Sequence, residues 1–332
     1  MSSLIDDDTR VNGAQRNAPA YVDAPETLSV VTTPHYWRWL GVVVVLVLLA
    51  QFGHSLVANP RFDWHTFGAF FVSKTIMSAL WVTIELTLIA AVLGFLGGLV
   101  LAIMRRSPNG LLRSVSWGFI WLFRSTPLIV QVLLWGFLGA LYTHIGFGVP
   151  FGPVFVEHET KDLIGPFVAA AIGLTIHQAA YAAEIIRAGL ISVDEGQLEA
   201  AAALGIPRRR QLSRIILPQA MRTIVPPAAN EVIGLLKGTS VVFILALPDL
   251  FYQVQTVYGR NGRIIPLLMV AVVWYVILTA SLSVVQFYVE RYFAKGAHRE
   301  LPPTPLQRFR RSLRAFVVRR RIRRDAATGA PA

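Results

Sequence analysis

Residues 192–218 read SVDEGQLEAAAALGIPRRRQLSRIILP and lie between two long apolar segments of the chain. This stretch is too polar to enter lipid and too regular to be an unstructured loop. Ser192, with Glu195 three residues later, predicts a capped helix start, and the alanine-rich run behind it favours a helix. Gly205 can end that helix and Pro207 can begin the next one. We therefore expect a short helix, a sharp turn and a second short helix.

Six apolar segments on either side of this loop are each long enough to cross a membrane, because about 20 helical residues span a hydrocarbon core of about 30 Å. They cover residues 37–58, 76–103, 117–146, 163–188, 224–248 and 264–289. The first follows a long acidic leader, whereas a signal peptide begins with a short positive region, so we expect it to be an uncleaved span. The predicted fold class is all-α: a polytopic membrane protein with six transmembrane helices.

The charge of the chain is concentrated at one end. The 332 residues are 54% hydrophobic and carry a formal net charge of +12. Residues 291–332 hold 12 Lys and Arg residues against only Glu300 and Asp325, so the rest is almost neutral. A basic tail on a membrane-embedded body argues against nucleic acid as a partner. Cysteine is absent, which excludes disulfides, thiolate metal sites and cysteine nucleophiles.

Basic residues in the connections predict the orientation, since cytoplasmic loops are rich in Lys and Arg. The connections after the second and fourth apolar segments, with the tail, hold 21 basic residues, and the opposite connections hold five. Both termini and the loop 192–218 are therefore expected in the cytoplasm. On the outer side, Gly and Pro in residues 148–162 predict a turn-rich loop.

The loop motif resembles a known family. Glu199-Ala200-Ala201 is followed after three residues by Gly205, and after nine more by Ile215, one residue and Leu217-Pro218. This spacing resembles the EAA loop of permease subunits in ATP-binding-cassette (ABC) importers. Further stretches look like the polar amino-acid uptake subfamily: AYAAEIIRAGL at 180–190, RSTPLIVQ at 124–131, LPQA at 217–220, Pro226-Pro227, Asn230 and LKGTS at 236–240. The resemblance covers about residues 70–295.

The resemblance implies a five-helix permease core with one added N-terminal helix and a cytoplasmic coupling-helix loop. The expected domains are a cytoplasmic segment 1–36, the extra transmembrane helix 37–60, the permease domain 70–295 with its coupling loop 192–218, and a basic cytoplasmic tail 296–332. Residues expected to dock an ATPase are Glu199, Ala200, Ala201, Gly205, Ile215, Leu217 and Pro218. Small alanine side chains would let a partner surface approach closely, and rigid docking would transmit its movement. The alternative is an ordinary amphipathic helix lying on the membrane.

The chain has no nucleotide-binding loop of its own. Lys237-Gly238-Thr239-Ser240 reverses the Gly-Lys order of a phosphate loop and lies in an apolar segment. We expect no enzyme activity, no metal site and no cofactor bound by this chain, with ATP and Mg held by a partner. The resemblance implies a cytoplasmic ABC ATPase dimer, a second permease copy or paralogue, an extracytoplasmic amino-acid-binding protein and membrane lipid as partners. The location implied is a prokaryotic cytoplasmic (inner) membrane.

Ionisable residues inside spans are costly and usually face the bundle interior or water. Arg124, three residues before Pro127, is either part of a hinge near the inner gate or a snorkelling or capping cation. Glu184 has Arg187 three residues on, as well as His177 and Tyr181 on its face, and is a paired acid or a gate residue. The gate or hinge candidates are therefore Arg124, Pro127 and Glu184.

A polar face of the fifth apolar segment is the best candidate for a substrate pathway. Lys237 shares a helical face with Asn230, while Glu231 lies on another face, so we expect no ion pair between Glu231 and Lys237. The alternative for Lys237 is pairing inside the bundle. In the second segment, Glu85 is either a pathway acid or the partner of a basic residue. The pathway candidates are Asn230, Lys237, Thr239, Ser240 and Glu85.

The tail has helical periodicity. In residues 306–324 the apolar positions recur at spacings of three and four, and arginines fill most of the rest. This pattern is typical of a basic amphipathic helix on the anionic inner leaflet, and the alternative is a disordered tail that fixes orientation.

The function predicted is the permease subunit of an ABC importer that carries a polar amino acid, powered by ATP hydrolysis in a separate subunit. Two alternatives come from other classes. A non-transporting membrane anchor that recruits an ATPase would not need polar residues along its spans. A proton-coupled secondary transporter predicts an internal inverted repeat, which the sequence does not display.

Overall fold

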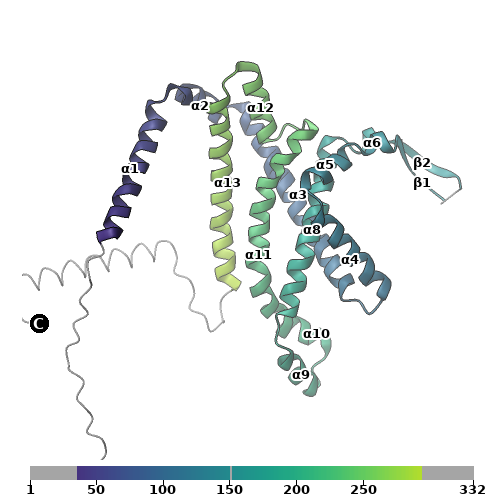
Figure 1. Ribbon diagram of the computed structural model, residues 1–332. Coiled ribbons are helices and arrows are strands. Elements are labelled where there is room, and N and C mark those ends of the chain that lie inside the picture. The colour runs from purple at the N-terminus through teal and green to yellow at the C-terminus, as the bar shows by residue number, and fades with distance from the viewer. Residues whose placement is uncertain (1–35, 150–151, 294–332) are drawn as a thin grey trace, which may run out of the picture. The chain divides into compact units, whose positions relative to one another are not determined.

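The computed structural model describes residues 36–149 and 152–293 (Figure 1). The chain divides into two compact units, residues 1–59 and 60–332, and each is described by itself. The first unit contributes α1 (Tyr36–Ala58), a helix with apolar residues on all sides and no buried residue. Its length and composition suit a membrane span, in agreement with the prediction for residues 37–58.

The second unit is a helical bundle with one small sheet. Its first half contains η1 (Pro60–Phe62), α2 (Trp64–Phe71), α3 (Lys74–Arg105), α4 (Gly110–Ser125), α5 (Leu128–Gly136), α6 (Leu138–Leu141), β1 (His144–Gly148) and β2 (Val154–Glu159). Its second half contains α7 (Thr160–Leu163), α8 (Pro166–Ile191), α9 (Glu195–Ala203), α10 (Arg208–Gln211), η2 (Leu212–Ile216), α11 (Leu217–Gly238), η3 (Thr239–Leu245), α12 (Leu250–Asn261) and α13 (Ile264–Phe293).

The described residues contain five helices that are long and apolar enough to span a membrane, or six if a bent pair counts as one span. The bent pair is α4 and α5, whose axes turn by 105°. Residues 117–146, expected as one span, therefore form no single continuous helix, but a bent pair whose second helix ends at Gly136. Pro127 stands at the break, where it has no N–H to continue the helix of α4.

A β-hairpin replaces the turn-rich loop expected after the third segment. Strands β1 and β2 pair antiparallel, with His144 opposite Glu159 and Phe147 opposite Val156. The prediction of an all-α fold is correct for the helices but missed this sheet. The β-branched and aromatic residues Val154, Phe155 and Val156 are the strand signal that the sequence contained.

The loop 192–218 also differs in detail from its prediction. Ser192 ends α8, and the cap of α9 is Asp194, whose carboxylate accepts the N–H of Gln197 at 3.2 Å. The predicted capping box is therefore wrong. The second helix is not short either, because residues 208–245 form one helical run of 38 residues. A π-helical turn, η2, precedes Pro218 in that run and accommodates a residue that lacks an N–H.

The closest packing in the bundle is between α3 and α8. A Cβ atom built on Gly98 would lie 2.6 Å from the Cβ of Ala182, and one on Gly94 would lie 2.4 Å from the Cγ of Gln178. Glycines four residues apart let two helices approach closely, which is a common way to pack helices in membranes. This contact fixes α8 and hence the position at which α9 begins.

The opposite end of the bundle is closed by α2 and α12 (Figure 1). Trp274 on α13 donates its indole N–H to the carbonyl of Phe71 at 2.8 Å, and Arg263 forms an ion pair with Asp63. Trp64, Phe67, Phe71 and Trp274 form a continuous row of ring contacts along α2 to α13. The predicted N-terminal segment 1–36, apart from Tyr36, and the predicted tail helix 306–324 lie outside the described residues.

Candidate functional site

Helix α9 is held against the start of α11 by side-chain contacts. Gln219 donates to Gln197 at 2.6 Å, and Ser192 donates to Thr223 at 3.0 Å. Val193 is buried beneath the loop and packs with Ala220 and Ile224. These contacts join α9 to the helix that follows it, so the loop is a fixed projection of the bundle.

The turn after α9 depends on Gly205. Its φ of +67° is in the left-handed region, where a side chain is strained. The N–H of Gly205 bonds to the carbonyl of Ala202, and the N–H of Ile206 bonds to that of Ala201, which is a Schellman ending. Gln211 then donates to the carbonyl of Ile206 at 2.7 Å and closes the turn. The sequence predicted this helix end at Gly205, and the structure confirms it.

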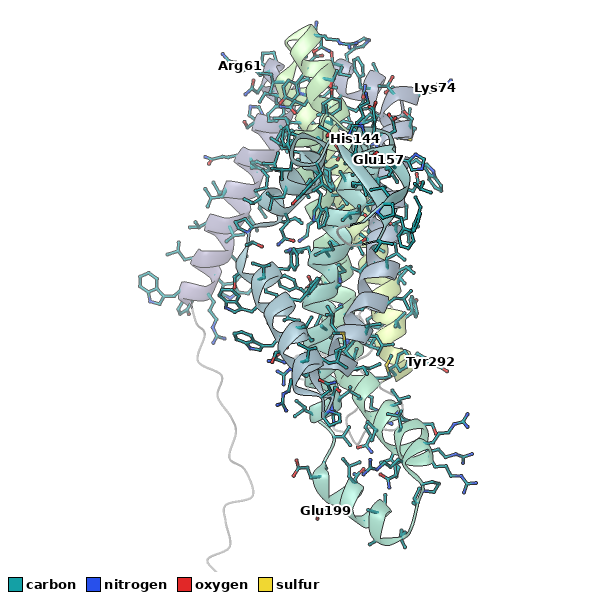
Figure 2. The ribbon with its side chains drawn as sticks, turned by 90° about the vertical axis from the view of Figure 1, so that its right-hand side faces the viewer. Arg61, Lys74, His144, Glu157, Glu199 and Tyr292 are labelled. Atoms are coloured by element: carbon teal, nitrogen blue, oxygen red, sulfur yellow. The ribbon has the colours of Figure 1, made fainter. Side chains whose placement is uncertain are left out.

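The predicted docking residues do not all face outward. Glu199, Ala200 and Gly205 are exposed, and Figure 2 shows Glu199 at the end of the structure opposite Arg61 and Lys74. Ala201 is only 3% exposed and faces inward, so it supports the helix and is closed to a partner. A groove of about 530 Å³ lies beside the turn, lined by Leu204, Gly205, Ile206, Pro207, Arg210, Arg214 and Ile215. The loop thus exposes the carboxylate of Glu199 and a groove lined by both apolar residues and arginines.

A polar pocket of about 370 Å³ lies between the ends of α3, α4 and α8. Its lining includes Arg105, Trp117, Trp121, Arg124, Tyr181 and Glu184. Two of the three predicted gate residues, Arg124 and Glu184, therefore meet in one pocket. Trp117 and Trp121, one helical turn apart, stack at 6.2 Å and add an aromatic wall that the sequence analysis did not single out.

The acidic residue of this pocket forms an ion pair, whereas, over the described ranges, Arg124 does not. Arg187 donates its Nε to both carboxylate oxygens of Glu184 at 3.0 Å, which is the pairing that their spacing predicted. Arg124 makes no ion pair among the described residues; its guanidinium lies 5.3 Å from the centre of the Tyr181 ring. His177 contacts the other part of that ring at 4.7 Å. The pocket therefore contains an acid paired with Arg187 and two arginines, Arg105 and Arg124, that form no ion pair among the described residues.

The break between α4 and α5 is held by Gln131, which is 2% exposed. Its amide N–H donates to the carbonyl of Phe123 at 2.8 Å and to the carbonyl of Thr126 at 3.0 Å. These bonds satisfy carbonyls that the bend frees from the α4 helix. Gln131 thus fixes the bend at Pro127 and the position of Arg124 just before it. The position of Arg124 three residues before Pro127 led us to consider a hinge here, but the contacts of Gln131 were not predicted.

The predicted pathway residues do not form one cluster. Asn230 accepts from Gln286 on α13 at 2.9 Å, whereas Lys237 is exposed and forms no ion pair with Glu231. Thr239 is fully buried and donates to the carbonyl of Leu236, so it contributes to packing. Ser240 likewise donates to the carbonyl of Lys237. Glu85 is exposed on α3 and has no hydrogen bond or ion pair to any of these residues in the part of the chain that the structure describes.

A buried acid outside the candidate spans was not predicted. Asp249, in the connection between η3 and α12, has no exposed surface and caps α12 by accepting the N–H of Phe251 and Tyr252. Burial raises the pKa of this carboxyl to about 6, although the two N–H donors act against the rise. Its neighbour Leu250 donates its N–H to Thr83 on α3 at 3.0 Å. An Asp directly before an apolar helical run was the available sequence signal.

Residues 94–298 match the family described as "Binding-protein-dependent transport system inner membrane component". Among similar proteins, the arginine transport system permease protein ArgU of Corynebacterium glutamicum is 40% identical over 83% of this chain and 86% of its own length. The glutamate/aspartate import permease protein GltK of Escherichia coli is 33% identical over 65% of this chain and 92% of its own length.

A solved structure has the same fold. It is described as the crystal structure of an amino acid ABC transporter with histidines, is 31% identical in sequence and superposes with a TM-score of 0.55. The alignment covers 66% of this chain and 94% of the other. The matched share of that chain is therefore nearly complete.

Proposed function

The chain belongs to the family of binding-protein-dependent transport system inner membrane components, and on this premise we propose how it works as the permease subunit of an amino-acid ABC importer. A partner ATPase supplies the energy, a binding protein delivers a polar amino acid from outside, and two permease subunits enclose the path. The observation that carries the proposal is the rigid projection of α9, anchored to α11 and ending at Gly205. Relatives named for arginine and for glutamate/aspartate support an amino acid as the substrate class.

In this proposal the α9 loop is the cytoplasmic docking site of the ATPase. Glu199 supplies a directional charge, the exposed Ala200 allows close approach, and the groove beside Gly205 accepts part of the ATPase surface. Ala201 supports the loop from its buried side, Ile215 lines the groove, and Leu217 and Pro218 are exposed. Support comes from the contacts between Gln197 and Gln219 and between Ser192 and Thr223, which couple the loop directly to α11. A force on α9 would therefore move a membrane-spanning helix.

The docking proposal is tested with the double variant Glu199→Arg/Gly205→Trp. We expect loss of ATPase co-purification and of ATP-dependent uptake, because the variant reverses the charge and fills the groove. Lys74→Glu, a charge reversal at the opposite end of the chain (Figure 2), is the matched control and should leave both unchanged. If the double variant folds, as judged by its melting temperature, and still binds the ATPase and transports, the docking assignment is wrong.

We propose that the polar pocket between α3, α4 and α8 receives the amino acid. Arg124 would bind the α-carboxylate: like Arg105, it lines the pocket without an ion pair among the described residues, and it also lies against Tyr181. Tyr181 and the Trp117–Trp121 wall would contact the rest of the molecule. Lys237, Asn230, Ser240 and Glu85 are left as pathway candidates away from this pocket, and Thr239 as a packing residue.

The pocket is tested with Arg124→Gln in the reconstituted importer. A charge-assisted hydrogen bond contributes about 1.5–3 kcal/mol, so we expect the amino acid concentration for half-maximal uptake to rise about 10- to 150-fold. Arg113→Gln, on the same helix and outside the pocket, should behave as the unchanged protein. If Arg124→Gln lowers the melting temperature but leaves the concentration dependence unaltered, Arg124 serves structure only.

The orientation belongs to the same proposal. We place both termini and α9 in the cytoplasm, and η1, α2, α12 and the hairpin outside. The supporting observation is the excess of basic residues in the connections on the α9 side. Relatives in the family are inner-membrane components, which supports the cytoplasmic membrane of a prokaryote as the location.

A further inference from the structure

The hairpin β1–β2 stands apart from the helices. It projects sideways from α6 (Figure 1), and all six residues of β2 are exposed. Phe147 and Phe155 are 78% and 65% exposed. An isolated two-stranded hairpin is at best marginally stable, and three or more strands with an apolar face are needed for independent stability. The hairpin therefore lacks strands that would complete it.

The register gives the hairpin two unlike faces. Directly paired residues share a face, so Ile145, Phe147, Val156 and His158 lie on one side of the sheet. His144, Gly146, Glu157 and Glu159 lie on the other. The first face is mainly apolar and the second is acidic, as in a sheet that buries one side.

The two edges of this sheet are also unlike. Charged side chains protect an open strand edge against pairing with another chain. The edge strand β2 carries Glu157 and Glu159, whereas β1, with the sequence His-Ile-Gly-Phe-Gly, has neither a carboxylate nor an ammonium or guanidinium group. The edge open to a further strand is therefore that of β1.

We propose that β1 pairs antiparallel with β1 of a second copy of this chain, around a two-fold axis at Gly146. In this register Ile145 of each copy lies opposite Phe147 of the other, and Gly146 faces Gly146. The order becomes β2-β1-β1-β2, a four-stranded sheet with one apolar face formed by Ile145, Phe147 and Val156 of both copies. No like charges meet, because both acidic strands stay at the outer edges. Such a contact is self-complementary, as a two-fold interface requires.

The surface next to the hairpin supports a second copy as the occupant. From α5 through α6 to β1 the chain presents exposed apolar side chains at Leu134, Phe137, Leu141 and Tyr142, each 59–68% exposed. They lead directly to the β1 edge and extend the contact beyond the sheet. A lipid would not satisfy the free N–H and C=O groups of that edge, since open sheet edges do not occur in hydrocarbon.

The inference rests on the proposed pairing of two permease subunits, and cysteine cross-linking tests it because the chain has no native cysteine. Copies with different tags, one with Ile145→Cys and one with Phe147→Cys, are co-expressed with the full transporter and oxidised in membranes. Directly opposed residues lie within about 5.5 Å, which suits a disulfide. We expect a mixed dimer that forms at least tenfold faster than any dimer of copies with His158→Cys, which lies on the protected edge.

The outcomes distinguish failure of the β1 contact from failure of the proposed pairing of two permease subunits. If the two tagged copies co-purify but the mixed pair does not cross-link faster than His158→Cys, the β1 contact is overturned and the paired permease stands. If His158→Cys cross-links faster, the interface is the β2 edge and the proposal is wrong. If the copies do not co-purify, pairing of identical subunits fails, and the β1 contact with it.

Discussion

Gly205 shows how one backbone angle shapes the loop on which the proposed docking site stands. Its positive φ lets two N–H groups return to the carbonyls of α9 and directs the chain into α10. Any residue with a Cβ atom would be strained in this conformation, although nothing lies within 4 Å to obstruct it. Glycine is therefore needed at position 205 for its backbone conformation and not because a side chain would meet other atoms.

The Gly205→Ala variant isolates this requirement. We expect a loss of roughly 1–2 kcal/mol in the stability of the turn, because the left-handed region is costly for L-residues. The measurements are the melting temperature of the purified permease and the amount of ATPase that co-purifies. Gly259→Ala, within α12 and equally open, is the matched control and should stabilise by up to about 1 kcal/mol. Equal behaviour of the two variants would contradict the role of Gly205.

Asp249 leads to a prediction about pH. Its raised pKa, about 6 against about 4 in the unfolded chain, means that the folded protein keeps a proton that the unfolded protein has lost between these values. The free energy of unfolding should therefore fall as the pH rises from about 4 to about 6 and stay constant at higher pH. The whole decrease should be about 3 kcal/mol.

Two variants test this at Asp249. Asp249→Asn keeps an oxygen for the N–H groups of Phe251 and Tyr252, so it should be at least as stable at pH 7.5 and lack the fall with pH. Asp249→Ala removes the cap and should lose about 0.5–2 kcal/mol. Melting curves of the detergent-solubilised protein at several pH values measure both. A fall of the same size in Asp249→Asn would show that another group is responsible.

Individual residues could be predicted from sequence where a local rule governs them. Gly205 as a helix end and the pairing of Glu184 with Arg187 follow from neighbours in the chain. The cap of α9 did not, because Ser192 and Asp194 both suit a helix start and the end of α8 takes the first. Arg124 and Tyr181 meet through the packing of α4 on α8, which no local spacing records.

At the scale of elements, the crossing of α3 and α8 depends on small residues. The Gly98→Leu variant places a side chain where Ala182 Cβ and Ala183 N lie at 2.6 and 2.9 Å from the Cβ position. Backbone cannot move aside cheaply, so we expect a loss of at least about 1–3 kcal/mol and a lower yield of folded permease. Gly118→Ala on α4, with open space around it, is the control. Similar melting temperatures would show that the contact tolerates separation.

The apolar segments could be located from sequence, but their shapes could not. Long runs of apolar residues predicted α1, α3, α8 and α13 within a few residues, since lipid imposes a simple length rule. The fifth segment, predicted as 224–248, is part of a helical run that begins at Arg208. The third segment broke at Pro127 because bonds from Gln131 to carbonyls of the preceding helix stabilise a sharp bend. The hairpin was missed because glycines and a short length resemble a loop.

For the whole molecule, the family could be predicted from the loop and its flanking motifs, and the comparisons confirm it. The contacts of the site residues could not be predicted from the sequence in the same way. Helical periodicity put Asn230 and Lys237 on one face, yet Asn230 bonds to Gln286 of α13, 56 residues away. Contacts between distant helices arise only in the assembled bundle.

The orientation of the molecule can be measured in intact cells with single-cysteine variants. Figure 2 shows Lys74 and Glu199 at opposite ends, and both are exposed. We expect Lys74→Cys to react with a membrane-impermeant maleimide added outside, and Glu199→Cys to react only after the membrane is opened. The unchanged chain, without cysteine, supplies the background. Labelling of Glu199→Cys in intact cells would reverse the assigned orientation.

The continuous helical run of residues 208–245, made of α10, η2, α11 and η3, has a mechanical consequence. At a rise of about 1.5 Å per residue, its 38 residues are more than 50 Å long. The α9 loop is attached by side-chain contacts near one end. A tilt imposed at α10 is therefore amplified with distance along the run and is largest near η3, at the far end of the bundle. There the chain leaves the run through Ala246, at a φ of +55°. A small movement of the partner ATPase at the α9 end would therefore become a large displacement of the chain at η3.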